Sequence, residues 1–238
     1  MTESSGRPDE SVTRTDERSP VTGNRHLGDG SDTVGGVTDR TPVSGAASDL
    51  PTLPAVLDRL RSHVLEHSVK HGEFVLKSGA RSSWFLDTKQ TACRPDGIVA
   101  TTEAFLDVFA DVIGEIDAIG GLTMGSDPVA YGIAAVAATR GHRLRSFSVR
   151  KQAKQGGITG RIAGALQPGD RVLVTEDTTT RGTSLMEAAD EIAAFGAVPV
   201  WMTVIVDRGG TCAAMAEARG IDYRPLLGAP DLGFGYGT

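Results

Sequence analysis

The chain has 238 residues and a formal net charge of -6, from 24 Lys and Arg against 30 Asp and Glu, which argues against a general nucleic-acid-binding protein. Two cysteines, Cys93 and Cys212, cannot form a disulfide framework, and neither a signal peptide nor a run of roughly 20 apolar residues occurs in the sequence. We therefore expect a cytoplasmic protein without a membrane or nucleic-acid partner.

The composition changes near Leu50. Residues 1–50 contain 9 acids and 5 Arg but no Phe, Trp, Tyr or Lys. A segment so poor in large apolar side chains buries too little surface to offset the entropy of ordering it. We predict a disordered, acidic, Ser/Thr/Gly-rich tail over 1–50 and one folded domain over 51–238.

Helical and extended patterns alternate along that domain. Apolar residues recur at helical spacing over 53–65 and 98–112, and two extended runs between them, 73–77 and 84–87, predict a small hood. We then predict strands at 116–120, 144–149, 172–175 and 198–206, and helices at 128–138, 184–195 and 211–218. Apolar strands that alternate with helices are typical of a parallel sheet covered on both faces, which binds ligands at the carboxyl ends of its strands.

The segment VLVTEDTTTRGTS (172–184) is a buried strand followed by two acids and a loop of small residues that opens a helix. Backbone amides at a helix N-terminus can bind a phosphate. The carboxylates of Glu176 and Asp177 can accept hydrogen bonds from sugar hydroxyls. Together these features favour a phosphorylated ribose as ligand, and an ordinary helix cap after a strand is the alternative.

A long stretch between Pro128 and Gly169 contains no Asp or Glu. Its seven cations are Arg140, Arg143, Arg145, Arg150, Lys151, Lys154 and Arg161. Because Gln155-Gly156-Gly157 interrupts any regular pattern, we predict a mobile cationic loop over 150–161. Such a loop can close over a polyphosphate, and a solvated linker is the alternative.

Three of the five histidines, His63, His67 and His71, are spaced at i, i+4 and i+8. The third lies a helical turn too far away for one ion to reach it easily together with the first. We therefore predict a solvated helix face rather than a metal site.

Six segments together resemble the orotate phosphoribosyltransferases, a branch of the type I phosphoribosyltransferases. They are GEFVLKSG (72–79), RSSWF (81–85), RKQAK (150–154), the acid pair with its loop (176–184), DRGG (207–210) and LGAPDLG (227–233). The acid pair and its loop alone indicate only a phosphoribosyltransferase, whereas the KSG, RKxxK and DRGG segments point to the orotate branch. The resemblance implies an α/β, type I phosphoribosyltransferase-like fold, with about five mainly parallel strands flanked by helices and a small N-terminal hood.

The resemblance also implies a reaction, in which phosphoribosyl diphosphate (PRPP) and orotate give orotidine 5′-phosphate and pyrophosphate in pyrimidine biosynthesis. It implies Mg²⁺ as the cofactor, held mainly through PRPP without a certain protein ligand, and a homodimer that shares the catalytic loop across subunits. The implied catalytic residues are Lys151, Lys154, Glu176 and Asp177. PRPP would contact these four and Arg150, Thr178, Thr179, Thr180, Arg181, Gly182, Thr183 and Ser184, and orotate would contact Lys77, Trp84, Phe85, Thr180 and Arg208.

Four features depart from the family pattern. Gly156 stands where members usually carry a histidine, and Gln152 stands where the loop usually has an acid. Arg181 replaces a small or hydroxyl residue, and the loop 125–127 lacks a lysine that many members have. Two alternatives therefore stay open: a phosphoribosyltransferase for another base, and a PRPP-binding regulator with weak or no turnover. We favour orotate transfer because both loop lysines and both acids are present.

Overall fold

The structure is a computed structural model that describes residues 50–75, 81–154 and 160–237, with the backbone alone for Lys154. The predicted tail at 1–50 lies outside the described residues except for Leu50, and so do Lys77 and Gly156. The domain boundary at residue 51 therefore stays a prediction. Within the described residues, no helix combines the length and the apolar character needed to cross a bilayer.

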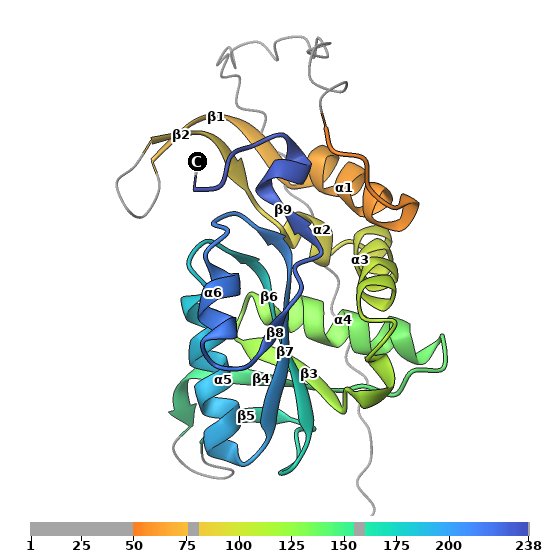
Figure 1. Cartoon of the computed structure of the whole chain (residues 1–238), viewed down its shortest axis with the longest axis vertical. Coiled ribbons are helices and arrows are strands. Elements are labelled where there is room, and N and C mark those ends of the chain that lie inside the picture. Colours follow the sequence, from red (N-terminus) through yellow and green to blue (C-terminus); the bar gives the residue numbers. More distant parts are fainter. Residues whose placement is uncertain (1–49, 76–80, 155–159, 238) are drawn as a thin grey trace, which may run out of the picture. The chain divides into compact units, whose positions relative to one another are not determined.

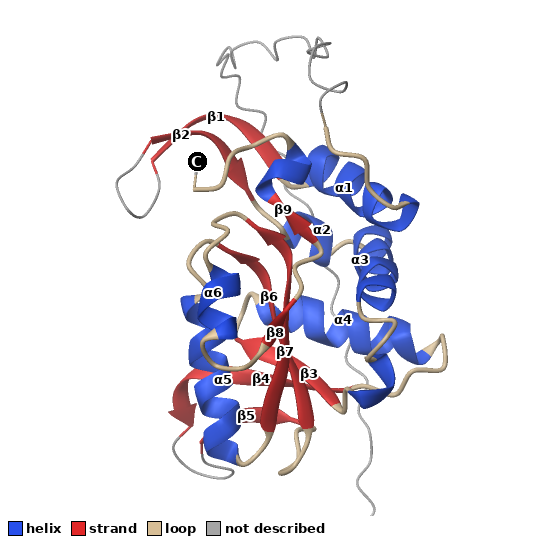
Figure 2. Cartoon of the chain, in the orientation of Figure 1, coloured by secondary structure: helices blue, strands red, loops and turns tan. Residues whose placement is uncertain are grey.

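Helices and strands alternate along the chain (Figures 1 and 2). The helices are α1 (Ala55–His67), α2 (Lys89–Ala92), α3 (Pro95–Val108), α4 (Ser126–Ala138), α5 (Thr183–Phe195) and α6 (Cys212–Glu217), with 3-10 turns η1 (Ile113–Glu115) and η2 (Ala229–Leu232). The strands are β1 (Val69–Val75), β2 (Arg81–Leu86), β3 (Ala118–Leu122), β4 (Arg145–Lys154), β5 (Gly160–Gly164), β6 (Arg171–Thr179), β7 (Val198–Asp207), β8 (Asp222–Tyr223) and β9 (Leu227–Gly228). The helix α2 and the strands β5, β8 and β9 have no counterpart in the sequence prediction.

The main sheet has seven strands in the order β5-β4-β3-β6-β7-β8, with β9 also paired to β7. All neighbouring strands in it run parallel except β5, which is antiparallel to β4. The predicted α/β class is confirmed, but the sheet is wider than the five strands expected. Two-residue strands such as β8 and β9 are too short to leave a pattern, and β5 begins inside the stretch interpreted as a loop.

Helices cover both faces of the sheet, α3 and α4 on one face and α5 and α6 on the other (Figure 1). Successive residues of β6 point to opposite faces, so Leu173 packs in the core that includes α3 and α4, whereas Val172 and Val174 pack against α5. Burial on both sides explains the uninterrupted apolar run of this strand. Because β3, β4, β6 and β7 are parallel, their carboxyl ends lie at one edge of the sheet, where ligands bind in such folds.

The antiparallel pair β1 and β2 forms the predicted hood. Side chains of β2 alternate between exposed and buried, and Trp84 is among the buried ones. Its ring stacks on Phe234 with 3.9 Å between the centroids. The Arg208 guanidinium, directly after β7, lies 4.4 Å from the centroid of the Trp84 ring. These contacts place the hood over the carboxyl end of β7.

Candidate active site

A cavity of about 340 Å³ opens where the carboxyl ends of β3, β4 and β6 meet. Its lining residues come from α2, the loop after β3, β4, the end of β6 and the first turn of α5. They are Lys89, Leu122, Thr123, Met124, Gly125, Lys151, Glu176, Asp177, Thr178 and Ser184. The cavity therefore brings together five residues predicted for one site from separate parts of the sequence.

The two acids at the end of β6 are both buried, yet their surroundings differ. Asp177 accepts hydrogen bonds from Lys89 Nζ at 2.6 Å, from Thr88 Oγ1 at 2.9 Å and from the backbone N–H of Thr178 at 3.0 Å. These donors satisfy a negatively charged carboxylate. For Glu176, burial and the neighbouring charge of Asp177 raise the pKa to about 8. The raised pKa favours the protonated form of Glu176 at neutral pH.

The lysine beside this acid pair, Lys89, has no place in the sequence prediction. Burial lowers its pKa, but the hydrogen bond and the charge of Asp177 outweigh that effect, and the net shift is upward. Lys89 is therefore a cation at the centre of the site. It supplies positive charge beside a loop, 125–127, that carries no lysine. The polar segment Asp87-Thr88-Lys89 lies directly after β2 and could have indicated a site residue, but the sequence analysis assigned no role to Lys89.

Gly125 allows the loop after β3 to approach the acid pair. A Cβ atom at this position would lie 1.6 Å from Glu176 Oε1 and 2.7 Å from Asp177 Oδ1. Since both acids are buried and cannot swing away freely, a side chain here would displace them. A glycine at position 125 is thus a steric requirement of the packing around Glu176.

The loop between β6 and α5 leaves the helix N-terminus open. Thr178 Oγ1 donates to the carbonyl of Val206 at 3.0 Å, and Thr179 Oγ1 accepts from the N–H of Gly182 at 2.8 Å. These two hydroxyls stabilise the loop itself. Gly182 has a φ of +76°, a conformation that favours glycine, and no side chain caps α5. The first amides of the helix therefore face outward, as an anion site requires.

Some of the side chains at the N-terminus of α5 that were predicted to contact PRPP are accessible to a ligand. Thr180, Arg181 and Thr183 are exposed, and Ser184 lines the cavity. Thr178 also lines the cavity, although its hydroxyl is engaged with β7. Of the predicted phosphate-binding residues, the structure thus leaves Thr180, Arg181, Thr183 and Ser184 available for a ligand, together with the backbone amides.

The cationic stretch 128–169 is less free than its sequence indicates. Three of its seven cations pair with acids from outside the stretch: Arg140 with Glu103, Arg145 with Asp170, and Arg161 with Glu187 and Glu191. The residues 150–154 belong to β4 rather than to a loop, which corrects that part of the prediction. The composition of this stretch does not reveal these ion pairs, because the acids that form them lie outside the stretch.

Two of the predicted diphosphate contacts can be placed. Lys151 is exposed and lines the cavity, whereas the Arg150 guanidinium donates to the carbonyl of Gly160 at 3.5 Å and is partly buried. The side chain of Lys154 and the loop residues 155–159 lie outside the described part of the chain. Lys151 is thus the predicted loop cation that the structure brings to the acid pair.

The turn after β7 sets Arg208 beside Thr180. Asp207 accepts hydrogen bonds from the N–H groups of Gly209 and Gly210, both at 2.9 Å, and so shapes the turn. A Cβ atom on Gly209 would lie 1.6 Å from the carbonyl oxygen of Thr180, so a glycine is needed there. Burial lowers the pKa of Arg208, and this shift leaves the guanidinium charged at neutral pH. Two residues predicted to contact orotate therefore lie in adjacent loops.

Two other residues predicted to contact the base, Trp84 and Phe85, lie on opposite faces of β2. Trp84 points inward and lies under the Arg208 guanidinium, whereas Phe85 points to the opposite face of β2, where its ring lies 5.5 Å from that of Phe74. Neighbouring residues of a strand face opposite sides, so one chain cannot present both rings to one ligand. Lys77 lies outside the described residues.

Comparisons with known proteins identify the family of the chain. No family model matches the chain. The orotate phosphoribosyltransferase of Streptomyces avermitilis is 38% identical over 175 residues, which cover 73% of this chain and 95% of that protein, and that of Streptomyces coelicolor is 36% identical over 179 residues, 75% and 97%. The crystal structure of the Mycobacterium tuberculosis orotate phosphoribosyltransferase in complex with PRPP aligns with a TM-score of 0.64 and 31% identity, over 76% of this chain and all of that one. With this identity across nearly the whole length of its relatives, the chain belongs to the orotate phosphoribosyltransferase family.

Proposed function

We propose that the chain transfers the 5-phosphoribosyl group from PRPP to orotate, giving orotidine 5′-phosphate and pyrophosphate for pyrimidine biosynthesis. The observation that carries the proposal is one cavity that contains the buried acid pair Glu176 and Asp177, the cation Lys151, and Ser184 in the uncapped first turn of α5. The same set of groups meets the needs of a sugar that carries both a phosphate and a diphosphate.

Each part of PRPP has a matching group. The open N-terminus of α5, with Thr180, Arg181, Thr183 and Ser184, suits the 5′-phosphate, because uncapped amides and the helix dipole favour an anion. The acid pair suits the ribose hydroxyls, which donate hydrogen bonds to carboxylates. Arg150, Lys151 and Lys154 suit the diphosphate, whose negative charge grows as it leaves.

Orotate fits beside the Arg208 turn. A guanidinium can bind a planar carboxylate through two parallel hydrogen bonds, and Arg208 lies next to Thr180 at the carboxyl end of β7. Trp84 positions this guanidinium from the hood side. In our proposal Arg208 and Thr180 contact the base and Trp84 positions Arg208, while contacts from Lys77 and Phe85 stay predictions of the family resemblance.

The transfer breaks the bond between C1 of the ribose and the diphosphate oxygen, whose electron pair leaves with the diphosphate. The ring nitrogen of orotate bonds to C1 and gives up its proton to an oxygen of the departing diphosphate or to water. Positive charge develops on the ribose and negative charge on the diphosphate in the transition state. Cations around the diphosphate therefore stabilise the transition state more than the bound substrate.

Mg²⁺ fits the donor set at this site only as an ion carried in with PRPP. The oxygens of Asp177 are already bonded to Lys89, Thr88 and the Thr178 amide, and the raised pKa of Glu176 favours its protonated form. These residues do not form a cage of free oxygen ligands, and Mg²⁺ usually keeps substrate phosphates and waters in its shell. When bound, the ion would offset charge on the diphosphate.

The proposal includes a cytoplasmic homodimer with the catalytic loop shared between subunits. Both cysteines are free, Cys93 exposed and Cys212 buried, which suits a reducing compartment. Support for the dimer comes from the family resemblance, which implies that part of the loop following β4 acts in the neighbouring subunit.

The test is orotate consumption by the purified full-length protein with PRPP and Mg²⁺, with Lys154→Ala as the impaired variant and uracil as a second base. We expect loss of orotate with stoichiometric pyrophosphate, and a large loss of rate in the variant. Turnover of uracil but not orotate would indicate a different base. Tight PRPP binding without pyrophosphate release on either base would indicate a regulator instead.

A further inference from the structure

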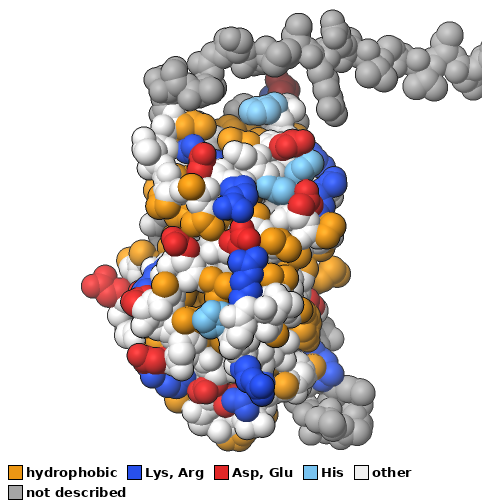
Figure 3. Space-filling view, turned by 90° about the vertical axis from the view of Figure 1, so that its right-hand side faces the viewer, with side chains coloured by type: hydrophobic (Ala, Val, Ile, Leu, Met, Phe, Trp, Pro, Cys, Tyr) orange, Lys and Arg blue, Asp and Glu red, His pale blue; other side chains and the backbone are white. Residues whose placement is uncertain are grey.

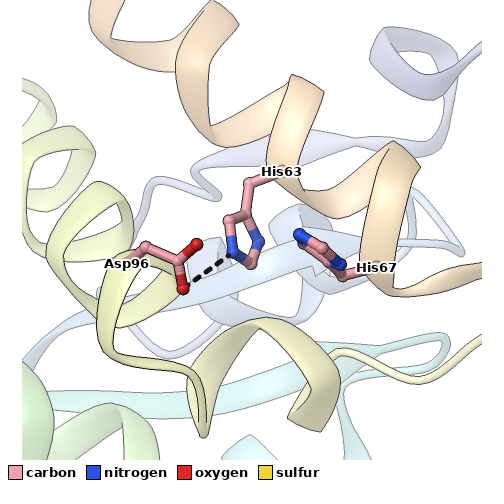
Figure 4. Close-up of side chains that lie close together, drawn as sticks. All are labelled: His63, His67 and Asp96. Atoms are coloured by element: carbon pink, nitrogen blue, oxygen red, sulfur yellow. Dashed lines mark ion pairs between the residues drawn. The ribbon is translucent and has the colours of Figure 1, made fainter.

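Three side chains with metal-ligating atoms meet outside the cavity described above (Figure 4). His63 and His67 are four residues apart on α1, and Asp96 lies in the first turn of α3. One ligand atom from each lies within 4.8 Å of the other two. On the face formed by α1, α3 and α4, histidine side chains reach the surface among acidic and basic ones (Figure 3). None of the three residues lines the candidate active site.

The innermost of the three, His63, is held in a defined orientation. Its Nδ1 lies 3.2 Å from Thr91 Oγ1, and that hydroxyl lies 2.7 Å from Ser68 Oγ. The side chain is only 10% exposed. A hydrogen bond at one ring nitrogen fixes the tautomer and the direction of the other, as in histidines that bind metals. The Ser68-Thr91 pair thus sets where Nε2 of His63 points.

The other nitrogen, Nε2, is buried and makes no hydrogen bond with any described residue. It lies 3.5 Å from Asp96 Oδ1, as the dashed line in Figure 4 marks. This contact is an ion pair only when the imidazole is protonated, and a neutral Nε2 that is buried without a hydrogen bond is costly. A cation between Nε2 and the Asp96 carboxylate would satisfy both groups.

The first turn of α3 comes this close because residue 97 is a glycine. A Cβ atom on Gly97 would lie 2.2 Å from the carbonyl oxygen of Thr91 and 2.7 Å from His63 Cε1. Asp96, the preceding residue, is thereby brought next to the imidazole. The juxtaposition of α1 and α3 at this point is therefore specified by the local sequence.

We propose that His63, His67 and Asp96 bind a divalent cation of the Zn²⁺ type, with a water molecule in the fourth position. Two imidazoles and one carboxylate are ligands that Zn²⁺ favours, and ligands four residues apart on a helix lie on one face. Tetrahedral Zn²⁺ holds its ligand atoms about 3.3 Å apart. The His63 and Asp96 atoms are already at 3.5 Å.

The remaining adjustment falls on the two more exposed ligands. The side chain of Asp96 is 69% exposed and that of His67 is 24% exposed, so both can rotate toward the ion without disturbing the core. Glu66 adds a carboxylate oxygen 3.8 Å from His67 Nε2 and contributes negative charge beside the cluster. The bound ion would connect α1 to α3 at the base of the hood.

The sequence analysis considered His63, His67 and His71 together and predicted a solvated helix face, which the burial of His63 contradicts. His71 belongs to β1 and lies beside the Phe234 ring, with 6.0 Å between centroids. The third ligand comes instead from Asp96, a residue distant in sequence. Periodicity along one helix cannot show a ligand that a second helix supplies.

The experiment titrates Zn²⁺ into the full-length, untagged protein after treatment with a chelator, without PRPP, and follows heat release and the unfolding temperature. Co²⁺ serves as a spectroscopic probe of coordination. We expect one equivalent of Zn²⁺ per chain, a higher unfolding temperature and the intense visible absorption of tetrahedral Co²⁺. His67→Ala and Asp96→Asn should weaken binding at least about ten-fold, and His71→Ala should leave it unchanged.

Both variants change partly exposed side chains, so they should fold, and their orotate assay with Mg²⁺ should match that of the wild type. The inference thus stands or falls separately from the proposed activity. Absence of stoichiometric binding, equal weakening by His71→Ala, or binding that survives in both His67→Ala and Asp96→Asn would overturn it.

Discussion

At the scale of single residues, the acid pair of the candidate site shows how neighbouring groups of one type acquire different properties. Asp177 has three hydrogen-bond donors, including the Lys89 ammonium, whereas Glu176 faces burial and the charge of its neighbour. Lys89 interacts with both acids, through a hydrogen bond and its charge with Asp177 and through its charge with Glu176.

The first prediction concerns Lys89. Replacing it by methionine keeps most of the length of the side chain but removes the ion pair at 2.6 Å from Asp177, which leaves a buried charge with less compensation. Loss of one charge-assisted hydrogen bond corresponds to about 1.5–3 kcal/mol, or about a 10- to 100-fold fall in kcat/KM for PRPP. Steady-state kinetics measures it, with the exposed Lys70→Met as the matched control. A rate within two-fold of wild type, about 0.4 kcal/mol, would exclude a role for Lys89.

The second prediction concerns pH. An acid whose pKa is raised in the folded state holds its proton more tightly there than in the unfolded chain. Folding stability therefore falls as the pH rises from the ordinary value of 4.5 to the folded-state value of about 8. Glu176→Gln removes this titration, so at about pH 9 the variant should exceed the wild type by about 1–3 kcal/mol in unfolding free energy.

That difference should shrink toward zero at about pH 5, where Glu176 is protonated in the folded protein. Denaturant unfolding at both pH values measures it, and the exposed Glu217→Gln serves as control. A difference that is independent of pH would show that Glu176 is ionised in the folded protein throughout this range.

At the scale of elements, the sequence predicted the long apolar strands and helices well. The β6-loop-α5 segment combines a doubly buried strand, an acid pair and a glycine at the helix start, and each feature leaves a local pattern. Short elements, and strands that form only by pairing with another strand, were not predicted. The strand β5 exists because β4 extends to Lys154 and pairs with it, and α2 has only four residues.

The candidate site was predictable where its residues lie at or just beyond the end of a strong strand pattern. Glu176 and Asp177 lie near the end of β6, Ser184 lies in the first turn of the helix after it, and Arg208 directly follows β7. Lys89 was missed because its importance depends on a partner 88 positions away. The ion pairs of cations such as Arg161 with Glu187 were not predicted for the same reason, because local composition does not show a partner that is distant in sequence.

The third prediction tests how two loops position Arg208. Gly209→Ala would place a Cβ atom 1.6 Å from the Thr180 carbonyl oxygen, so the two loops must separate and the guanidinium must move. We expect the KM for orotate to rise about ten-fold or more, with a smaller change in the KM for PRPP. Gly114→Ala, where a Cβ atom meets nothing within 4 Å, is the matched control. Equal effects on both substrates would indicate general misfolding of the site.

At the scale of the whole molecule, the candidate site draws on segments that are far apart in the described chain. It combines α2, the loop after β3, strand β4, the end of β6 and the start of α5, and the hood covers the carboxyl end of β7. Activity should therefore depend on the assembly of the sheet rather than on any one segment. A shared catalytic loop would extend this dependence to a second subunit.

The fourth prediction tests that sharing. If Lys154 of one subunit serves the acid pair of the other, a mixture of Lys154→Ala and Glu176→Ala chains, refolded together, should regain activity that neither has alone. Random pairing makes half of the dimers mixed, each with one complete site, so about a quarter of wild-type activity is expected. Activity of the mixture no higher than the sum of its parts would show that each chain supplies its own loop.

The stacking of Trp84 has a practical consequence for following ligands in solution. The chain contains two tryptophans: Trp84 lies under Arg208 and against Phe234, whereas Trp201 is buried in β7 beside Arg171. An indole responds to charges and rings that move near it, so its intrinsic fluorescence should change when a carboxylate binds Arg208. We expect orotate to change the emission of a Trp201→Phe variant saturably and to leave that of Trp84→Phe unchanged. The protein would then carry an optical reporter of base binding that needs no label and no turnover.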